Sequence, residues 1–144
     1  MERPRSLQPA EIRFRVRRRT RWSDEDNQHV LNNAIYLTLF EEARLAYFTE
    51  LGFVRGNQFP FLLAQTNVLF VAPGRGGVEV EIAARTVELG TTSFTQLYRV
   101  SDGASGAVWA EAEARLVLYD PATGAKRAMP EEFRRAIAQL EGLA

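Results

Sequence analysis

Residues 23–37 decide how this chain folds, and they read SDEDNQHVLNNAIYL. The first half of the stretch is polar and acidic and has no place in the interior of a sheet. The second half turns apolar directly after Asn32 and Asn33, whose side chains are suited to cap the start of a helix. The sequence therefore predicts a helix that begins at this point, immediately behind an acidic loop.

The predicted helix covers 33–51 and ends at Gly52, a residue that commonly follows a helix C-terminus. Its apolar residues extend over more than one narrow stripe, whereas its charged residues gather on the remaining side. Such a helix is expected to be wrapped by other elements. The apolar set is Ile35, Tyr36, Leu39, Phe40, Ala43, Tyr47, Phe48 and Leu51, and the charged set is Glu41, Glu42, Arg44 and Glu50.

Strand patterns flank this helix on both sides. Before it, apolar residues at 12, 14 and 16 alternate with arginines, which is typical of a half-buried strand. After a connector at 53–61, strands are predicted near 62–72, 77–89, 92–101 and 107–119, with Gly, Pro and Asp turns between them. The short connections favour an antiparallel meander. Pro130 opens a short amphipathic terminal helix, so the expected fold class is α+β.

The composition fits one domain over residues 1–144, with residues 1–10 as a flexible N-terminal extension. The chain has no cysteine, which excludes a disulfide framework, a thiolate zinc site and a cysteine nucleophile. It has one histidine, so a multi-histidine metal site cannot form within one chain. The acids of the 23–29 loop do not complete a calcium-binding pattern. We therefore expect no metal and no organic cofactor.

The polar, arginine-rich start and the absence of any long apolar run predict a cytoplasmic protein without a membrane partner. Residues 1–21 hold eight arginines, yet the chain as a whole has no net charge. A nucleic-acid partner is not expected, because one strand face in a neutral protein offers no reading element. These arginines form a solvated strand face, or alternatively contact the phosphates of a nucleotide-bearing substrate.

The acidic loop before the helix can support chemistry on a carbonyl group. Backbone N–H groups at a helix N-terminus and the helix dipole stabilise negative charge, as an oxyanion hole does. Asp24 and Asp26, with Glu25, are the acids placed to activate an attack on that carbonyl. The same pattern also serves to satisfy backbone N–H groups in loops. His29 is either a loop residue or a general base.

Residues 21–37, followed by FEEAR at 40–44, resemble the signature of the 4-hydroxybenzoyl-CoA thioesterase-like hotdog family. The resemblance implies a long central helix wrapped by a curved antiparallel sheet of about five strands, plus a short C-terminal helix. It implies subunits that join their sheets, with active sites at the interface. By motif position, Asp26 matches the nucleophile or general base, and the backbone N–H of Asn33 matches the group that polarises the thioester carbonyl. Asp24 matches a loop organiser.

Two departures from the family pattern bear on the site. Many relatives read Gly-His-Val-Asn-Asn before the helix, whereas here His29 stands at the glycine position and Val30 at the histidine position. Some members also carry basic residues in the hairpin after the third strand to hold coenzyme A phosphates, where this chain reads LGTT at 89–92. Phosphate contacts are then expected from other arginines, such as Arg85, Arg99 and the N-terminal set.

The resemblance implies hydrolysis of an acyl-CoA, or of an acyl carrier protein thioester, by a homodimer or a dimer of dimers. The acyl chain is expected between the helix start, the connector and the partner subunit. Two alternatives remain: an enoyl-thioester hydratase in which Asp26 and His29 meet across the substrate, and a non-catalytic acyl-CoA binding module. The substrate-binding residues of this hypothesis are Asp24, His29, Asn32, Tyr36, Phe59 and Phe61.

Overall fold

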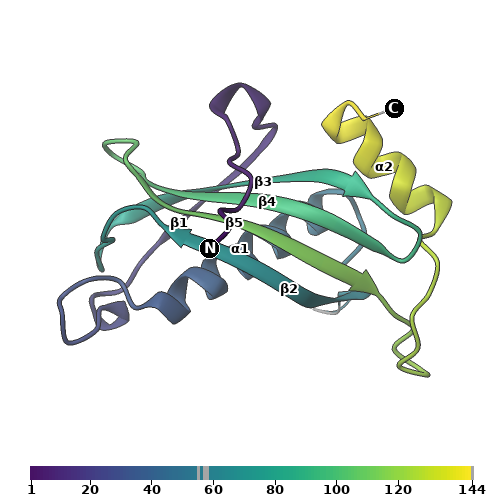
Figure 1. Ribbon diagram of the computed structural model, residues 1–144, viewed down its shortest axis with the longest axis horizontal. Helices are drawn as coiled ribbons and strands as arrows, with labels where there is room; N and C mark the ends of the chain where they lie inside the picture. Colours follow the sequence, from purple (N-terminus) through teal and green to yellow (C-terminus); the bar gives the residue numbers. More distant parts are fainter. Residues whose placement is uncertain (55, 57–58, 144) are drawn as a thin grey trace.

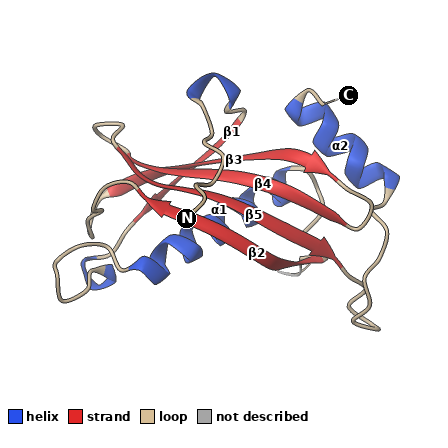
Figure 2. Cartoon of the chain, in the orientation of Figure 1, coloured by secondary structure: helices blue, strands red, loops and turns tan. Residues whose placement is uncertain are grey.

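A computed structural model describes residues 1–54, 56 and 59–143 of the chain. Within these residues a five-stranded antiparallel sheet curves around one long helix, and a shorter helix lies at one end (Figures 1 and 2). The predicted fold class is confirmed. The elements are β1 (Phe14–Arg19), α1 (Asn33–Glu50), β2 (Phe61–Phe70), β3 (Glu79–Leu89), β4 (Ser93–Asp102), β5 (Val108–Leu118) and α2 (Glu131–Glu141), with short 3-10 turns at Pro9–Glu11 and Trp22–Asp24.

The order of the strands differs from the predicted meander. Strands β3, β4 and β5 follow one another as expected, but β2 pairs with β5, and β1 pairs with β3, so the order is β1-β3-β4-β5-β2. The eight-residue connection between β2 and β3 must therefore cross from one side of the sheet to the other. The curvature of the sheet makes this crossing short, because the sheet bends around α1 (Figure 1). Connection length alone could not reveal it.

Helix α1 buries the broad face that its sequence predicted. Its side chains at 36, 39, 40, 43, 47 and 48 are all buried, and the aromatic ring of Phe48 contacts Phe61, Phe94 and Phe133. Arg44 corrects the prediction that the charges share an exposed side, since only 5% of it is exposed. Among the described residues no helix is long and apolar enough to span a membrane.

Arg44 belongs to a chain of buried polar groups that crosses the core. Its guanidinium donates to the Tyr98 hydroxyl, which donates to Gln96, and the Gln96 amide donates in turn to Thr86. The chain ends at α2, where Glu141 accepts hydrogen bonds from the Tyr47 hydroxyl at 3.0 Å and the Thr86 N–H at 2.6 Å. Burial raises the pKa of Tyr98 to about 12, against the effect of the Arg44 charge. The buried hydrogen bonds of Glu141 thus hold α2 against the sheet.

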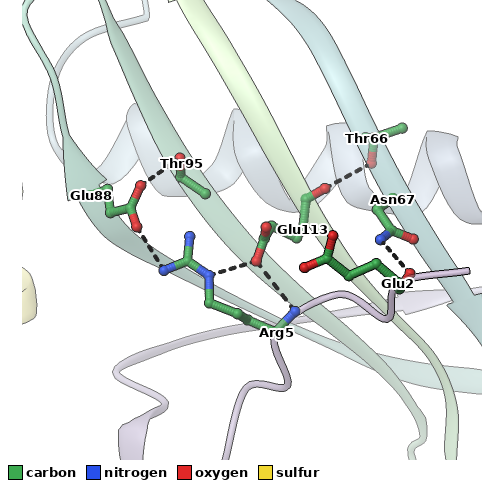
Figure 3. Close-up of polar contacts among 7 residues, drawn as sticks. All are labelled: Glu2, Arg5, Thr66, Asn67, Glu88, Thr95 and Glu113. Atoms are coloured by element: carbon green, nitrogen blue, oxygen red, sulfur yellow. Dashed lines mark hydrogen bonds and ion pairs between the residues drawn. The ribbon is translucent and has the colours of Figure 1, made fainter.

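The N-terminal segment packs on the outer face of the sheet, which differs from the flexible extension expected for residues 1–10. The Arg5 side chain forms ion pairs with Glu88 at 2.8 Å and Glu113 at 2.6 Å (Figure 3). Leu7 is fully buried in a small apolar cluster with Ala83 and Leu97. A polar composition suggested disorder, but one leucine and one paired arginine hold the segment in place. Of the connector predicted at 53–61, residues 55, 57 and 58 lie outside the described part.

We expect Glu141→Ala to lower the free energy of unfolding by about 2–4 kcal/mol, because it leaves a buried N–H and a buried hydroxyl unpaired. Urea unfolding measures the change. Burial raises the pKa of Glu141 above its ordinary value of 4.5. A carboxyl that binds its proton more tightly in the folded chain stabilises the fold at low pH, and this contribution is lost as the pH rises through the raised pKa.

Glu141→Gln keeps an acceptor for the same two donors but cannot ionise. As the pH rises above 4.5 and through the raised pKa, the parent is therefore expected to lose more stability than this variant. Equal pH profiles for the two proteins would show that Glu141 does not titrate between the folded and unfolded states as its burial implies.

Leu7→Ala tests the docking of the N-terminal segment. We expect a loss of about 1–2 kcal/mol, smaller than for a leucine in the main core, because the segment can detach locally instead of leaving a cavity. Amide hydrogen exchange of residues 5–12 is expected to become faster in this variant. If those amides exchange at the unprotected rate already in the parent, the segment is not docked in solution.

Candidate active site

The acidic loop ahead of α1 is closed by backbone hydrogen bonds into a small antiparallel hairpin. The N–H of Asp26 donates to the Val30 carbonyl at 2.9 Å, and the N–H of Asn32 donates to the Asp24 carbonyl at 2.9 Å. Between these two bonds Glu25 and Leu31 form an isolated bridge. Asp26 therefore stands on one leg of the hairpin, and the other leg runs directly into the first turn of α1.

Two carboxylates of this loop accept backbone N–H groups that lie close to them in the sequence. Asp24 Oδ2 accepts the N–H of Arg21 at 2.8 Å, and Asp26 Oδ1 accepts the N–H of Gln28 at 2.8 Å. Asp24 was predicted to organise the loop, and both Asp24 and Asp26 accept a backbone N–H close by in the chain. In the described part of the chain no hydrogen bond engages Asp26 Oδ2. One oxygen thus fixes the loop while the other remains open on a half-exposed side chain.

The start of α1 supplies an open donor close to this loop. Asn32 is the N-cap, and its side chain accepts the N–H of Ala34 at 2.9 Å. Asn33 is the first helical residue, and none of the hydrogen bonds among the described residues uses its N–H. Both asparagines are exposed. The positive end of an 18-residue helix dipole and a free N–H group therefore face solvent beside the hairpin.

The crossing between β2 and β3 locks the hairpin in position. The Gly74 carbonyl accepts the N–H of Leu31 at 2.9 Å, and the N–H of Gly76 donates to the Glu25 carboxylate at 2.9 Å. A Cβ on Gly74 would lie 2.5 Å from the Tyr36 hydroxyl and 2.6 Å from the Trp109 ring, so no side chain fits there. These contacts were missed from sequence, where the PGRGG run signalled only a turn.

The structure separates the residues that were predicted to share an acyl pocket. Tyr36 and Phe61 are 2% and 3% exposed, which argues against direct contact with a substrate. Phe59 follows the C-terminus of α1, whereas Asn33 opens its N-terminus. An 18-residue helix is about 27 Å long, so the two ends cannot line one pocket within a protomer.

His29 lies in the same tight turn as Asp26, and its N–H donates to the Asp26 carbonyl at 3.0 Å. Its φ of 62° is in the left-handed region, which is rare for a residue other than glycine. The position matches glycine in the family pattern, so the backbone here keeps a glycine-like conformation. The imidazole is exposed and belongs to the same turn, three residues after Asp26 in the sequence.

The neighbouring groups give the site its electrostatic character. Burial raises the pKa of Tyr36, although the Gly74 backbone beside its hydroxyl acts in the opposite direction. Its phenol therefore stays neutral at physiological pH. No cluster of three or more His, Cys, Asp or Glu side chains that could hold a metal ion occurs in the described residues. The second oxygen of Asp26 and the N–H of Asn33 are among the groups of this site that no hydrogen bond of the described residues engages.

An apolar cavity of about 410 Å³ lies at the other end of α1. The connector, the segment between β5 and α2 and the first turn of α2 form its walls, and its lining includes one arginine and one glutamate. It is lined by Gly52, Phe53, Phe59, Pro60, Leu118, Pro121, Arg127, Pro130, Glu132 and Phe133.

Comparison with known proteins identifies the family of the chain. The family model of the thioesterase-like superfamily matches residues 20–137. A thioesterase from Thermus thermophilus, solved with coenzyme A and Zn, is 31% identical and superposes with a TM-score of 0.81, over 92% of this chain and 97% of that one. A thioesterase superfamily protein from Jannaschia sp. CCS1 is 25% identical, with a TM-score of 0.83 over 94% of this chain and 87% of that one.

A 1,4-dihydroxy-2-naphthoyl-CoA thioesterase from Synechocystis shares the fold at 20% identity, with a TM-score of 0.78 over 88% of this chain and 96% of that one. No protein of curated function matches the chain by sequence. The match over residues 20–137 contains the acidic hairpin, α1, all strands after it and most of α2. The chain therefore belongs to the thioesterase-like superfamily, and its resemblance to the hotdog thioesterases is confirmed.

Proposed function

We propose that this chain, an acyl-CoA thioesterase by its family and fold, uses Asp26 to activate the attack on the thioester and the Asn33 N–H to hold the carbonyl oxygen. The observation that carries the proposal is the closed hairpin. It holds a carboxylate with one open oxygen beside the unoccupied N–H of a long helix. These are the two groups that thioester hydrolysis requires.

The proposed reaction needs no metal and no organic cofactor. In the general-base route, the Asp26 carboxylate removes a proton from water as the water oxygen bonds to the carbonyl carbon. The carbonyl oxygen becomes an oxyanion held by the Asn33 N–H and the helix dipole. Collapse of the intermediate breaks the carbon–sulfur bond, and the proton passes to the departing thiolate. In the nucleophilic route, an Asp26 oxygen bonds to the carbonyl carbon, the carbon–sulfur bond breaks and the thiolate leaves. Water then hydrolyses the mixed anhydride, which frees the acid, regenerates the Asp26 carboxylate and supplies the proton that the thiolate takes up.

The free edges of the sheet support a homodimer. Edge strand β1 carries four arginines among six residues, a charge density that discourages pairing with another strand. Edge strand β2 reads FLLAQTNVLF and carries no charge. Leu62, Leu63 and Phe70 on it are 58%, 43% and 45% exposed. We propose that two copies pair through β2. A further pairing of dimers stays a prediction.

Antiparallel pairing of the two β2 strands would also bring the cavity of one protomer close to the Asp26 hairpin of the other, which lie at opposite ends of α1 within one protomer. It places the connector end of one subunit beside the start of α1 in the other. The 410 Å³ cavity, with Phe59 on its wall, would then face the Asp26 hairpin of the partner. We propose that this cavity receives the acyl chain. An acyl carrier protein thioester would present the same reacting group and therefore remains a possible substrate of this site.

The cytoplasmic location stays a prediction.

Asp26→Asn is the decisive substitution. The amide oxygen keeps the bond to the Gln28 N–H, so the loop is retained, but the side chain can neither accept a proton nor attack. Thiol release from short, medium, long and aromatic acyl-CoA esters is expected to fall in kcat by about a hundredfold or more. Equal turnover by both proteins would remove Asp26 from the mechanism. Saturable binding without turnover by either would support the binding module instead.

A charge placed on β2 tests the assembly. Leu62→Glu, alone or with Phe70→Glu, is expected to give monomers in light scattering and to lower activity in parallel, because each site needs both subunits. Arg115→Glu, also on an exposed sheet position, is the matched control and is expected to leave the assembly unchanged. An active monomer would contradict a shared site.

A further inference from the structure

Trp22 is the most exposed large apolar side chain within the folded domain, with 82% of its surface open. It lies in the short 3-10 turn Trp22–Asp24, directly ahead of the hairpin that carries Asp26. The chain's other tryptophan, Trp109, is 5% exposed and packs in the core. A solvent-exposed tryptophan beside the candidate active-site loop offers a flat aromatic surface on which another ring can stack.

Three exposed arginines lie on the two segments that meet at this tryptophan, because residues 19–22 run beside the crossing loop. The Arg19 guanidinium donates to the Gly77 carbonyl at 2.8 Å, and the Thr20 hydroxyl donates to the Arg75 carbonyl at 2.9 Å. A Cβ on Gly76 would lie 2.9 Å from the Trp22 Cα, so the two segments are in contact there. Arg19, Arg21 and Arg75 are all exposed.

The acids of this region do not cancel these charges at the surface. Asp24 and Glu25 are half-buried, and their carboxylates accept the N–H groups of Arg21 and Gly76. Arg21 reaches Asp24 only at 3.9 Å, and its side chain is 81% exposed. The two carboxylates thus bind backbone N–H groups, whereas the Arg21 guanidinium is open to solvent and Arg19 remains exposed although it binds the Gly77 carbonyl. The surface around Trp22 is an aromatic face bordered by positive charge.

We propose that Trp22, with Arg19, Arg21 and Arg75, binds the adenine nucleotide end of the coenzyme A thioester. The base stacks on the indole, and the arginines pair with the phosphates. This inference rests on the proposed function and makes it more specific, because a carrier protein thioester has no adenine to stack. The arrangement also supplies phosphate contacts that the LGTT hairpin at 89–92 lacks.

The test compares an acyl-CoA ester with the acyl-pantetheine of the same acyl group, which lacks the nucleotide. Trp22→Ala is expected to lower kcat/KM for the coenzyme A ester about tenfold, as for loss of one stacking ring, and to leave the pantetheine ester unchanged. Trp22→Phe is expected to retain most of the activity. Arg21→Ser combined with Arg75→Ser is expected to lower the coenzyme A value and its dependence on salt, whereas Arg115→Ser changes neither.

A binding measurement gives a readout apart from turnover. Adenosine 3′,5′-bisphosphate is expected to quench the tryptophan fluorescence of the parent, because Trp22 is the exposed one of two tryptophans, and to leave Trp22→Ala unaffected. Four results would overturn the nucleotide site: equal losses with both esters, no loss with either, monomers in light scattering of Trp22→Ala, or an arginine effect confined to acyl carrier protein substrates. A parent that hydrolyses neither ester would instead refute the proposed function.

Discussion

The contact between the 71–78 crossing and the start of α1 is the constraint on which the rest of the structure depends. Since β2 and β3 lie on opposite sides of the sheet, the chain must pass over the end of the helix between them. It does so without a side chain at Gly74, against the Tyr36 hydroxyl and the Trp109 ring. The passage that completes the sheet also provides the carbonyl that fixes Leu31 and the N–H that holds Glu25. Fold and site are therefore built by the same segment.

The two edges of the sheet are the basis for the proposed dimer, in which each site takes residues from both subunits. The arginines of β1 protect that edge, whereas β2 leaves its backbone groups and apolar side chains open to a second strand. Within a protomer the apolar cavity and the Asp26 hairpin lie at opposite ends of α1. Pairing through β2 reverses the direction of the second helix. Chemistry and acyl binding can then meet, one from each subunit.

The sequence predicted the local structure well because local structure depends on periodicity and caps. The apolar spacing of α1, its Asn32 cap and the strand alternation are readable in neighbouring residues. Strand order is not, because an eight-residue link can join neighbours or cross a curved sheet. The docking of residues 1–10 rests on Leu7 and Arg5, whose partners lie far along the chain, on β3, β4 and β5. The helix start and the connector cannot line one pocket within a protomer, because α1 separates them by its whole length. That argument needs only the number of helical residues, so it could have been made from the sequence alone.

The three acids of the hairpin show how one short loop combines stability with reactivity. Asp24 and Glu25 accept backbone N–H groups, and each tethers the loop to a different neighbouring segment. Asp26 accepts one such group within its own turn and keeps its second oxygen open. A loop fixed only by its reactive group would move whenever that group bound a proton or a substrate. Because backbone hydrogen bonds and the two neighbouring carboxylates also hold the loop, the proposed mechanism lets Asp26 change its charge or its bonding while the Asn33 N–H keeps its place.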